Sequence, residues 1–435
     1  MGLLRKVFGG SSAALAALAA TFSLPSHAQS NVDTIVFAGA VLEDANSEPR
    51  GETTILIENG RIVGVEDGFL PIVPSNATQI NLRDKTVMPG LIDLHTHLSG
   101  DPSGEFWRAA TTPPEYYTLI AAKNARITAL AGFTTVRDLG SRTDQVTQSL
   151  RTATEQGIVP GPRIVTSART ISIVGGHGDV NGFHKHVNDV LASGFTCTGA
   201  VECSEKVRQA SKYGADLIKI TATGGVLSQQ GRGLEEHFTA EEMEAIVETA
   251  ELLGLKVAAH AHGARGIEAA AKAGVHTIEH GTYMDEAAAR AMKASGTTLV
   301  PTLMAFQGIK ENLGTGFYTP VVEEKIRAVS EIADTIIPRA REYGVNIAFG
   351  TDAGVFPHGE NAGEFALMVA GGMSSREAIA AATTGAAQIL GMEGEIGRIA
   401  PGYSADLIAV DGNPLNDVTT LESVDFTMVR GRVIE

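Results

Sequence analysis

Two histidines, His95 and His97, end an apolar segment that reads Gly90-Leu-Ile-Asp-Leu-His-Thr-His97. Alternate residues of a β-strand point to the same face, so both imidazoles can aim at one point. Imidazole nitrogens are good ligands for zinc and related divalent ions. Two strand-end histidines can equally well be ordinary hydrogen-bonding residues. The pair alone does not decide between a metal site and a structural role.

Four further residues with metal-ligating or acid–base side chains occur at or near the ends of other apolar segments. They are Lys219, His260, His280 and Asp352. Each has a structural explanation when taken alone, such as a core histidine or a helix cap. It is improbable that all of these residues lie at strand ends by chance. The pattern therefore predicts one site built from several strands.

The scaffold for such a site is predicted from eight apolar segments that alternate with amphipathic helical stretches. The segments cover residues 90–97, 133–137, 163–166, 216–221, 256–260, 275–280, 298–301 and 345–349. A helix is expected at 114–131, and another should begin at Thr239, where Thr239-x-x-Glu242 forms a capping box. This alternation favours an α/β fold, a (β/α)8 TIM-type barrel, whose active site lies at the C-terminal ends of the strands.

At both ends of the chain the sequence predicts short strands without helices between them. Residues 34–38, 54–57 and 61–65 precede the barrel pattern, with an Asn59-Gly60 hairpin between the last two. Residues 405–410, 426–429 and 432–434 follow it. We expect these ends to pair into a small β-sandwich. The predicted domains are thus residues 29–87 with 400–435 for the sandwich, and 88–399 for the barrel.

The N-terminal segment and the net charge limit the cellular location of the protein and the partners that it can bind. Residues 1–28 have a basic start, an apolar run and a small residue at Ala28, which is typical of a signal peptide. We therefore expect cleavage after Ala28 and export to the periplasm or secretion, with a retained N-terminal anchor as the alternative. No later stretch is apolar enough to span a bilayer. A formal charge of −16 disfavours nucleic acid and anionic membranes as partners. Cys197 and Cys203 are expected to form a local disulfide in an oxidising compartment, with two free thiols as the alternative.

With these residues the chain resembles the amidohydrolase superfamily. Met88-Pro-Gly-Leu-Ile-Asp93 and Gly402-x-x-Ala405-Asp406-Leu407 are also typical of it. Four motifs are similar to the branch that holds bacterial Xaa-Pro dipeptidases, related carboxypeptidases and amidases that hydrolyse ochratoxin. These motifs are Gly175-Gly-His177-Gly, Ala222-Thr-Gly-Gly225, Ala259-His-Ala-His-Gly263 and Pro357-His-Gly-Glu-Asn361. The resemblance covers nearly all of the chain after the signal segment.

The resemblance implies two divalent metal ions, with zinc as the first choice. His95 and His97 would bind one ion, and His260 and His280 the other. Lys219 would be carboxylated to a carbamate that bridges both, and Asp352 would ligate one ion and shuttle a proton from the attacking water.

Two further histidines are candidates for substrate contact. In the resembled branch the residue at His177 contacts the substrate. His262 shares a strand face with His260 and could therefore face the substrate. Many relatives in the resembled branch have tyrosine at this position, which leaves open the exact partner of the developing oxyanion or substrate carboxylate. The alternative is that His262 supports His260 through a hydrogen bond. His358 could be a pocket wall or a surface residue, Asp93 is expected to be structural, and a metal site at His184-x-His186 is disfavoured because its loop offers no further ligand.

The expected function is hydrolysis of a peptide-like amide in a small, dipeptide-like substrate, by a dipeptidase, carboxypeptidase or N-acyl amino acid amidase, with ochratoxin-type amides included. A lactonase or deaminase of the same superfamily is one alternative. A non-catalytic metal-binding or solute-binding protein is another, though it would not need Asp352. The branch also implies a homo-oligomer. Substrate choice should depend on the loops 99–114, 177–200, 225–237 and 304–319.

Overall fold

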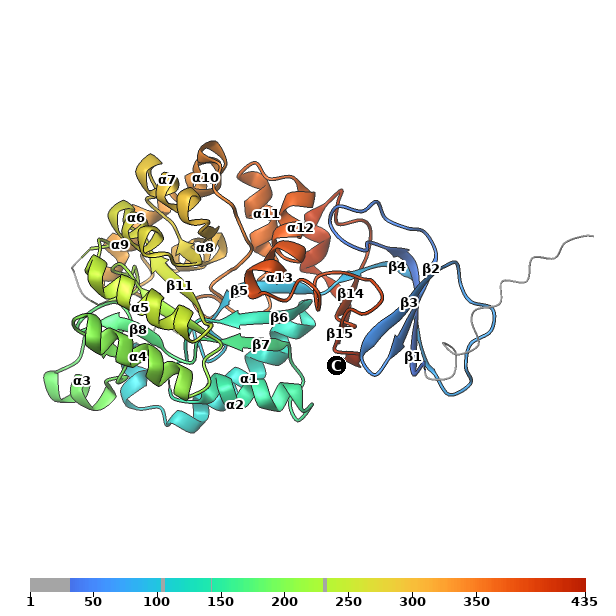
Figure 1. Ribbon diagram of the computed structural model, residues 1–435, viewed down its shortest axis with the longest axis horizontal. Helices are drawn as coiled ribbons and strands as arrows, with labels where there is room; N and C mark the ends of the chain where they lie inside the picture. The colour runs from blue at the N-terminus through green and yellow to red at the C-terminus, as the bar shows by residue number, and fades with distance from the viewer. Residues whose placement is uncertain (1–31, 103–105, 142, 230–232) are drawn as a thin grey trace, which may run out of the picture.

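The computed structural model describes residues 32–102, 106–141, 143–229 and 233–435. The expected signal segment at 1–28 lies outside the described residues. Strands surrounded by helices make up the larger part of the molecule, and a sheet built from both ends of the chain lies beside it (Figure 1).

The strands of the larger part form two parallel sheets. A three-stranded sheet contains β5 (Leu91–Thr96), β6 (Phe133–Asp138) and β7 (Arg163–Thr166), in that order. A six-stranded sheet has the order β13-β12-β11-β10-β8-β9. Its strands are β8 (Thr170–Ile173), β9 (Thr196–Cys197), β10 (Leu217–Thr221), β11 (Lys256–Ala261), β12 (Thr277–His280) and β13 (Thr298–Val300). The predicted α/β class with parallel strands is confirmed, because every pair within these two sheets is parallel.

Helices lie outside these strands and bury their apolar faces against them (Figure 1). The expected helix at 114–131 is α1 (Pro114–Leu130), and α5 (Ala240–Leu252) has the predicted Thr239–Glu242 capping box. The remaining helices are α2 (Val146–Glu155), α3 (Lys185–Leu191), α4 (Ala200–Lys212), α6 (Ala264–Ala273), α7 (Glu286–Ser295), α8 (Leu303–Glu311), α9 (Pro320–Ser330), α10 (Ile336–Tyr343), α11 (Gly363–Ala370), α12 (Ser375–Ala381) and α13 (Thr384–Leu390).

The prediction of a regular eighth strand at residues 345–349 is wrong. The segment makes one isolated bridge, between Ile347 and Leu299, with two backbone hydrogen bonds to Leu299 of β13 and one to Leu94 of β5. Ala348 N donates to Leu299 O at 2.8 Å, and Leu94 N donates to Phe349 O at 3.1 Å. An apolar pattern predicts extended, buried backbone but not the register that a continuous ladder requires. The segment therefore joins the two sheets, while a continuous eight-stranded barrel is not confirmed by the ladders.

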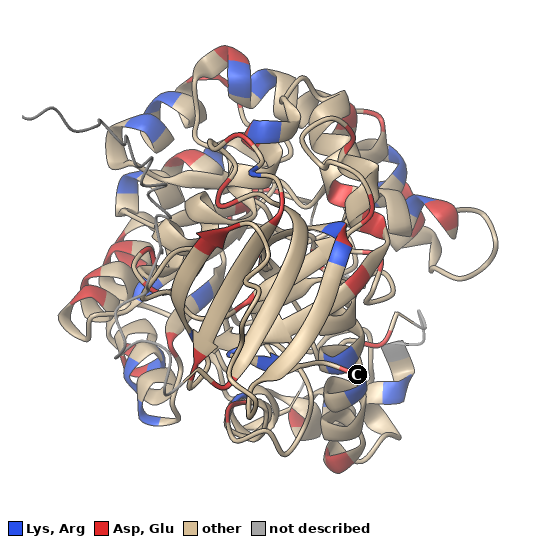
Figure 2. Ribbon diagram, turned by 90° about the vertical axis from the view of Figure 1, so that its right-hand side faces the viewer, with Lys and Arg blue, Asp and Glu red and all other residues tan. Residues whose placement is uncertain are grey.

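Both ends of the chain form one seven-stranded sheet with the order β16-β15-β14-β4-β1-β2-β3. Its strands are β1 (Thr34–Val41), β2 (Thr53–Glu58), β3 (Arg61–Asp67), β4 (Thr78–Pro89), β14 (Leu407–Val410), β15 (Val424–Val429) and β16 (Arg432–Val433). In Figure 2 most of the ribbon of this sheet is tan, and charged residues are more frequent in the helices around it. The expected pairing of the two ends is confirmed by the antiparallel β4–β14 pair. A two-sheet sandwich is not confirmed, because these strands form a single sheet.

Two local predictions are confirmed. Asn59 and Gly60 both have positive φ, 50° and 75°, as a two-residue hairpin turn between β2 and β3 requires. Cys197 and Cys203 form a disulfide that ties β9 to the first turns of α4. Over the described residues, we find no helix with both the length and the apolarity needed to cross a bilayer.

Candidate metal centre

One buried cavity of about 190 Å³ collects the predicted ligands at the ends of strands from both sheets. Its lining includes all of the predicted metal ligands and both further histidines, namely His95, His97, His177, Lys219, His260, His262, His280 and Asp352. Residues separated by up to 257 positions thus meet at one place. Within the cavity, two groups of side chains could each hold a cation.

The first group is His95, His97 and Asp352, whose candidate ligand atoms all lie within 4.8 Å of one another. Asp352 Oδ1 lies 3.4 Å from His95 Nε2 and 3.3 Å from His97 Nε2. Both rings are held from behind through Nδ1, by Glu279 Oε2 and by Gly140 O, each at 2.9 Å. This support orients both Nε2 atoms toward Asp352, as in histidines that ligate metals.

The second group is His260, His262 and His280. His280 Nε2 lies 2.9 Å from His260 Nδ1, so these two rings converge. Burial lowers the pKa of His260 and of His280 well below 6.5, and it lowers the pKa of His262 to about 3. The three imidazoles are therefore neutral at pH 7, which is the form that binds a metal.

Threonine hydroxyls hold two of these three rings. His262 Nδ1 contacts Thr282 Oγ1, and His280 Nδ1 contacts Thr302 Oγ1, both at 2.7 Å. These contacts occupy one nitrogen of each ring and leave the other for the cavity. His262 thus lines the cavity beside His260, on the strand face that the two residues share.

Lys219 lines the same cavity as both groups and is only 3% exposed. Its neighbours along β10, Ile218 and Ile220, belong to the apolar core, because alternate residues of a strand point to opposite faces. Among the described residues, the Lys219 Nζ atom has no hydrogen-bond partner. Burial lowers the pKa of this amine to about 8, although Glu279 and Asp352 oppose the shift. A buried amine without a partner is costly, so the position fits a residue that is modified or bound in the working protein.

Backbone strain marks two of the candidate ligands. His280 and Asp352 have φ of 74° and 63°, in the left-handed region that residues other than glycine rarely adopt. Asp352 N donates to His95 O at 2.7 Å, which fixes the strained turn against β5. Strain of this kind is held by the surrounding structure, and it aims both side chains into the cavity.

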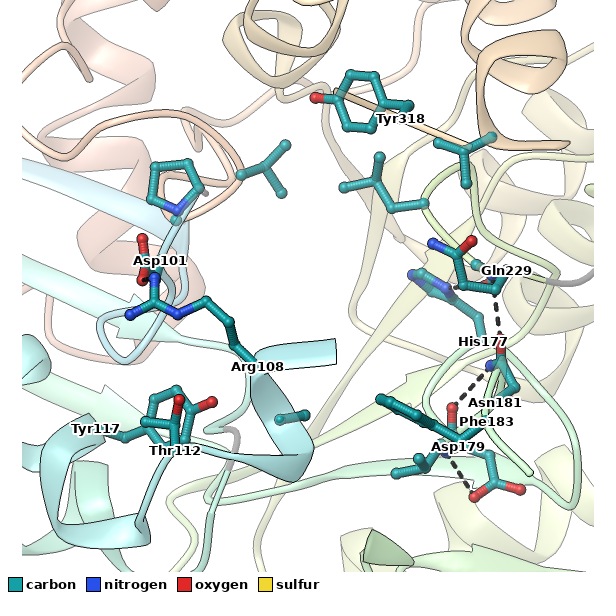
Figure 3. Close-up of a pocket in the computed structure, with 18 of the residues that line it drawn as sticks. Asp101, Arg108, Thr112, Tyr117, His177, Asp179, Asn181, Phe183, Gln229 and Tyr318 are labelled. Atoms are coloured by element: carbon teal, nitrogen blue, oxygen red, sulfur yellow. Dashed lines mark hydrogen bonds and ion pairs between the residues drawn. The ribbon is translucent and has the colours of Figure 1, made fainter. Parts of the chain in front are cut away.

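His177 lies in the loop after β8, and its ring centroid is 4.4 Å from that of His260. It lines both the inner cavity and an adjoining outer cavity of about 330 Å³ (Figure 3). The outer cavity carries aromatic side chains, including Tyr117, Phe183 and Tyr318, and an Arg108–Asp101 ion pair of 2.7 Å. His177 therefore stands where the two cavities meet.

The remaining candidates from the sequence are structural. Asp93 accepts hydrogen bonds from His95 N, Thr351 and Asn361, as expected for a buried support. His358 is buried and contacts Thr128 Oγ1 and His97 O, the residue that follows β5, so it is not a surface residue and is not part of the inner cavity lining. His184 and His186 have ring centroids 5.3 Å apart, and the described residues add no third ligand there.

Sequence reasoning missed Glu279 and Arg137 beneath the site. Both are buried, and Arg137 Nη2 donates to Glu279 Oε1 at 2.9 Å. Burial raises the pKa of Glu279, but Arg137 and His95 outweigh it and hold the pKa at about 2. A charged residue inside an apolar strand was the available signal in each case.

Comparison with known proteins shows the family to which the chain belongs. The profile of the amidohydrolase family matches residues 86–434. Ochratoxinase from Aspergillus niger is 31% identical over 412 residues, which cover 89% of this chain and 83% of that protein. A crystal structure of a Xaa-Pro dipeptidase with bound methionine has 39% identity and a TM-score of 0.86, with 92% and 99% of the two chains covered. A prolidase complexed with N-methylphosphonate-L-proline has 33% identity and a TM-score of 0.82, with the same coverage.

Proposed function

Because this chain belongs to the amidohydrolase family, we propose that it is a two-metal hydrolase that cleaves a peptide-like amide bond next to a carboxylate. Dipeptides and N-acyl amino acids are the proposed substrates. The observation that carries the proposal is the position of buried Lys219, in one cavity with two groups of metal-ligating side chains and with no hydrogen-bond partner for its amine among the described residues. The names of the similar proteins, a Xaa-Pro dipeptidase and an ochratoxinase, support the choice of an amide substrate.

Lys219 is proposed to act as a carbamate. The ammonium first releases a proton to solvent. The neutral amine then attacks the carbon of carbon dioxide, an N–C bond forms while one C–O π pair moves onto oxygen, and a second proton leaves to solvent. The product is an anion with two oxygens in place of a cation. That change suits a position in a cavity meant for divalent ions, because an ammonium group would be repelled by them. It also gives the buried nitrogen and its new oxygens partners that the free amine lacks.

Two divalent ions, proposed to be zinc because most of the ligands are imidazoles, would polarise the substrate carbonyl and acidify water when bound. His95, His97 and Asp352 would hold one ion, and His260 and His280 the other, with carboxylated Lys219 contributing to both.

Asp352 is proposed to be the proton shuttle. Burial raises its pKa, but the neighbouring His95 and His97 outweigh burial, and the pKa is lowered overall. It is therefore a carboxylate at neutral pH and can accept a proton. Its position in the cavity allows it to take that proton from the attacking water and pass it to the leaving nitrogen.

His177 and His262 are proposed to bind the substrate. Both rings line the inner cavity, and burial lowers the pKa of each to about 3, so each is neutral and can donate through one nitrogen. A neutral N–H stabilises a developing oxyanion or a substrate carboxylate without adding a cation beside the metals.

The test uses the purified chain loaded with zinc in the presence of bicarbonate. Xaa-Pro dipeptides and N-acyl amino acids are assayed beside lactones, before and after complete chelation. Amide cleavage should disappear on chelation and return with metal. Lactone turnover without amide cleavage, or hydrolysis that survives complete metal removal, would contradict the proposal.

Two variants sharpen this test. Lys219→Ala and Asp352→Asn should each lower kcat by several orders of magnitude, while Lys272→Ala, an exposed lysine on α6, should not. If the parent protein bound substrate without turning it over, and both variants bound it with the same affinity, the chain would be a binding protein.

A further inference from the structure

The segment Gly225–Gln229 lies directly against the ring of His177. Ser228 Oγ is 2.6 Å from His177 Nδ1. A Cβ atom added at Gly225 would lie only 2.1 Å from the same nitrogen. The ring therefore packs on the backbone at Gly225, and only glycine leaves room for it there. One short segment supplies both a hydrogen bond and a steric stop.

Helix α9 and its N-terminal end anchor this segment. Lys325 Nζ donates to the backbone carbonyls of Gly225 at 2.9 Å and Ser228 at 2.6 Å. The Thr319 hydroxyl donates to Gln229 Oε1 at 2.8 Å. On the other side, Gln229 N donates to Asn181 Oδ1, a contact that is visible in Figure 3. The segment is thus held between α9 and the loop that carries His177.

These contacts determine which nitrogen of His177 is available. Among the described residues, the Ser228 hydroxyl has no acceptor other than His177 Nδ1, so it donates to that atom. With the hydroxyl as the donor, the ring proton is assigned to Nε2. Within the described chain Nε2 makes no hydrogen bond, and the ring borders both the inner and the outer cavity. A donor is thereby directed at the place where a substrate would cross from one cavity to the other.

We propose that Ser228 and Lys325 are positioning residues for His177: Lys325 fixes the segment, Ser228 fixes the ring, and Nε2–H is left to donate to a substrate oxygen. The inference rests on the proposed hydrolase function. Neither positioning residue needs to touch the substrate. Their effect should pass entirely through His177, which distinguishes positioning from a general contribution to stability.

The experiment compares Ser228→Ala, Lys325→Met and His177→Ala in the zinc-loaded full chain. Each positioning variant should lower kcat/KM on the order of tenfold, the size expected for one lost hydrogen bond that orients a donor. Ser228→Thr and Lys325→Arg keep the donors and should recover most of the activity. Lys272→Met, on the exposed face of α6, serves as the matched lysine control and should match the parent. Metal content should be unchanged in all of these variants.

A double-mutant cycle decides the question. Adding Ser228→Ala or Lys325→Met to His177→Ala should cause no further loss, because the residue they position is already gone. The same variants are also compared by the inhibition constant of an N-phosphonyl amino acid, a mimic of the tetrahedral intermediate whose binding does not require turnover. Losses that multiply in the His177→Ala background, or single variants that match the parent, would overturn the inference. Absence of hydrolysis in the parent protein would instead contradict the proposed function, and the inhibitor cycle would still report on the positioning.

Discussion

Glu279 Oε2 lies 2.9 Å from Nδ1 of His95, and both side chains are almost completely buried. Glu279 also accepts a hydrogen bond from Arg137 through its other oxygen. It therefore connects a candidate metal ligand to a buried cation. A carboxylate in this place fixes the tautomer and the direction of the imidazole, so that Nε2 faces the cavity.

Substitution Glu279→Gln should weaken this support. The amide cannot accept from both neighbours, and Arg137 would remain buried without a full counter-charge. We expect zinc affinity to fall about 10- to 100-fold and the free energy of unfolding of the metal-free protein to fall by about 3 kcal/mol. Metal titration and urea denaturation measure the two effects. Glu268→Gln, on the surface of α6, is the control, and equal metal affinity in both variants would contradict this role.

Carboxylation of Lys219 has a consequence that can be measured without turnover. Protein purified with zinc and bicarbonate should carry an added mass of one carbon dioxide at Lys219 under conditions that preserve the carbamate. The Lys219→Ala variant should bind less than two zinc ions per chain, because a shared ligand is lost. Two tightly bound ions in that variant would exclude a bridging role for this residue.

The Cys197–Cys203 disulfide closes a short loop, since the two residues are six positions apart. In the chain-entropy account, a loop of this size stabilises the fold by about 2 kcal/mol. The double substitution Cys197→Ala and Cys203→Ala should lower the urea midpoint accordingly and leave kcat unchanged, because the pair is not part of the inner cavity lining. Reduced parent protein should behave as the variant does. An unchanged midpoint in both would show that the bond contributes nothing to stability.

Glu364 predicts a dependence of stability on pH. Burial raises its pKa from 4.5 to about 8, although the backbone N–H groups of Met304 and Leu303 oppose the shift. Between pH 4.5 and pH 8 the folded protein holds a proton on Glu364 that the unfolded chain releases. The contribution of Glu364 to the free energy of unfolding is therefore complete below pH 4.5 and is lost as the pH rises toward 8. The stability of the parent relative to Glu364→Gln should therefore decrease from pH 5 to pH 8. Urea unfolding of both proteins across that range measures the slope, and parallel curves would refute the assignment.

Much of the candidate site followed from residue types alone. His95, His97, Lys219, His260 and His280 were predicted because a strand presents alternate residues to one face and parallel strands end at the same edge. Those rules depend on the chemistry of the backbone and hold wherever such segments occur. The disulfide, the Thr239 capping box and the Asn59-Gly60 turn were equally local, since each depends on residues only a few positions apart.

What only the tertiary structure decided concerns contacts between distant segments. Glu279 beneath His95, Thr302 behind His280 and Ser228 behind His177 are separated from their partners by 184, 22 and 51 positions. No periodic pattern encodes these meetings, because they depend on how the strands and loops pack. The same reason explains why residues 345–349 join two sheets without forming a regular strand, and why Asp352 reaches the cavity through a strained turn. Apolar spacing determines which residues are buried, but packing determines which of the buried groups face one another.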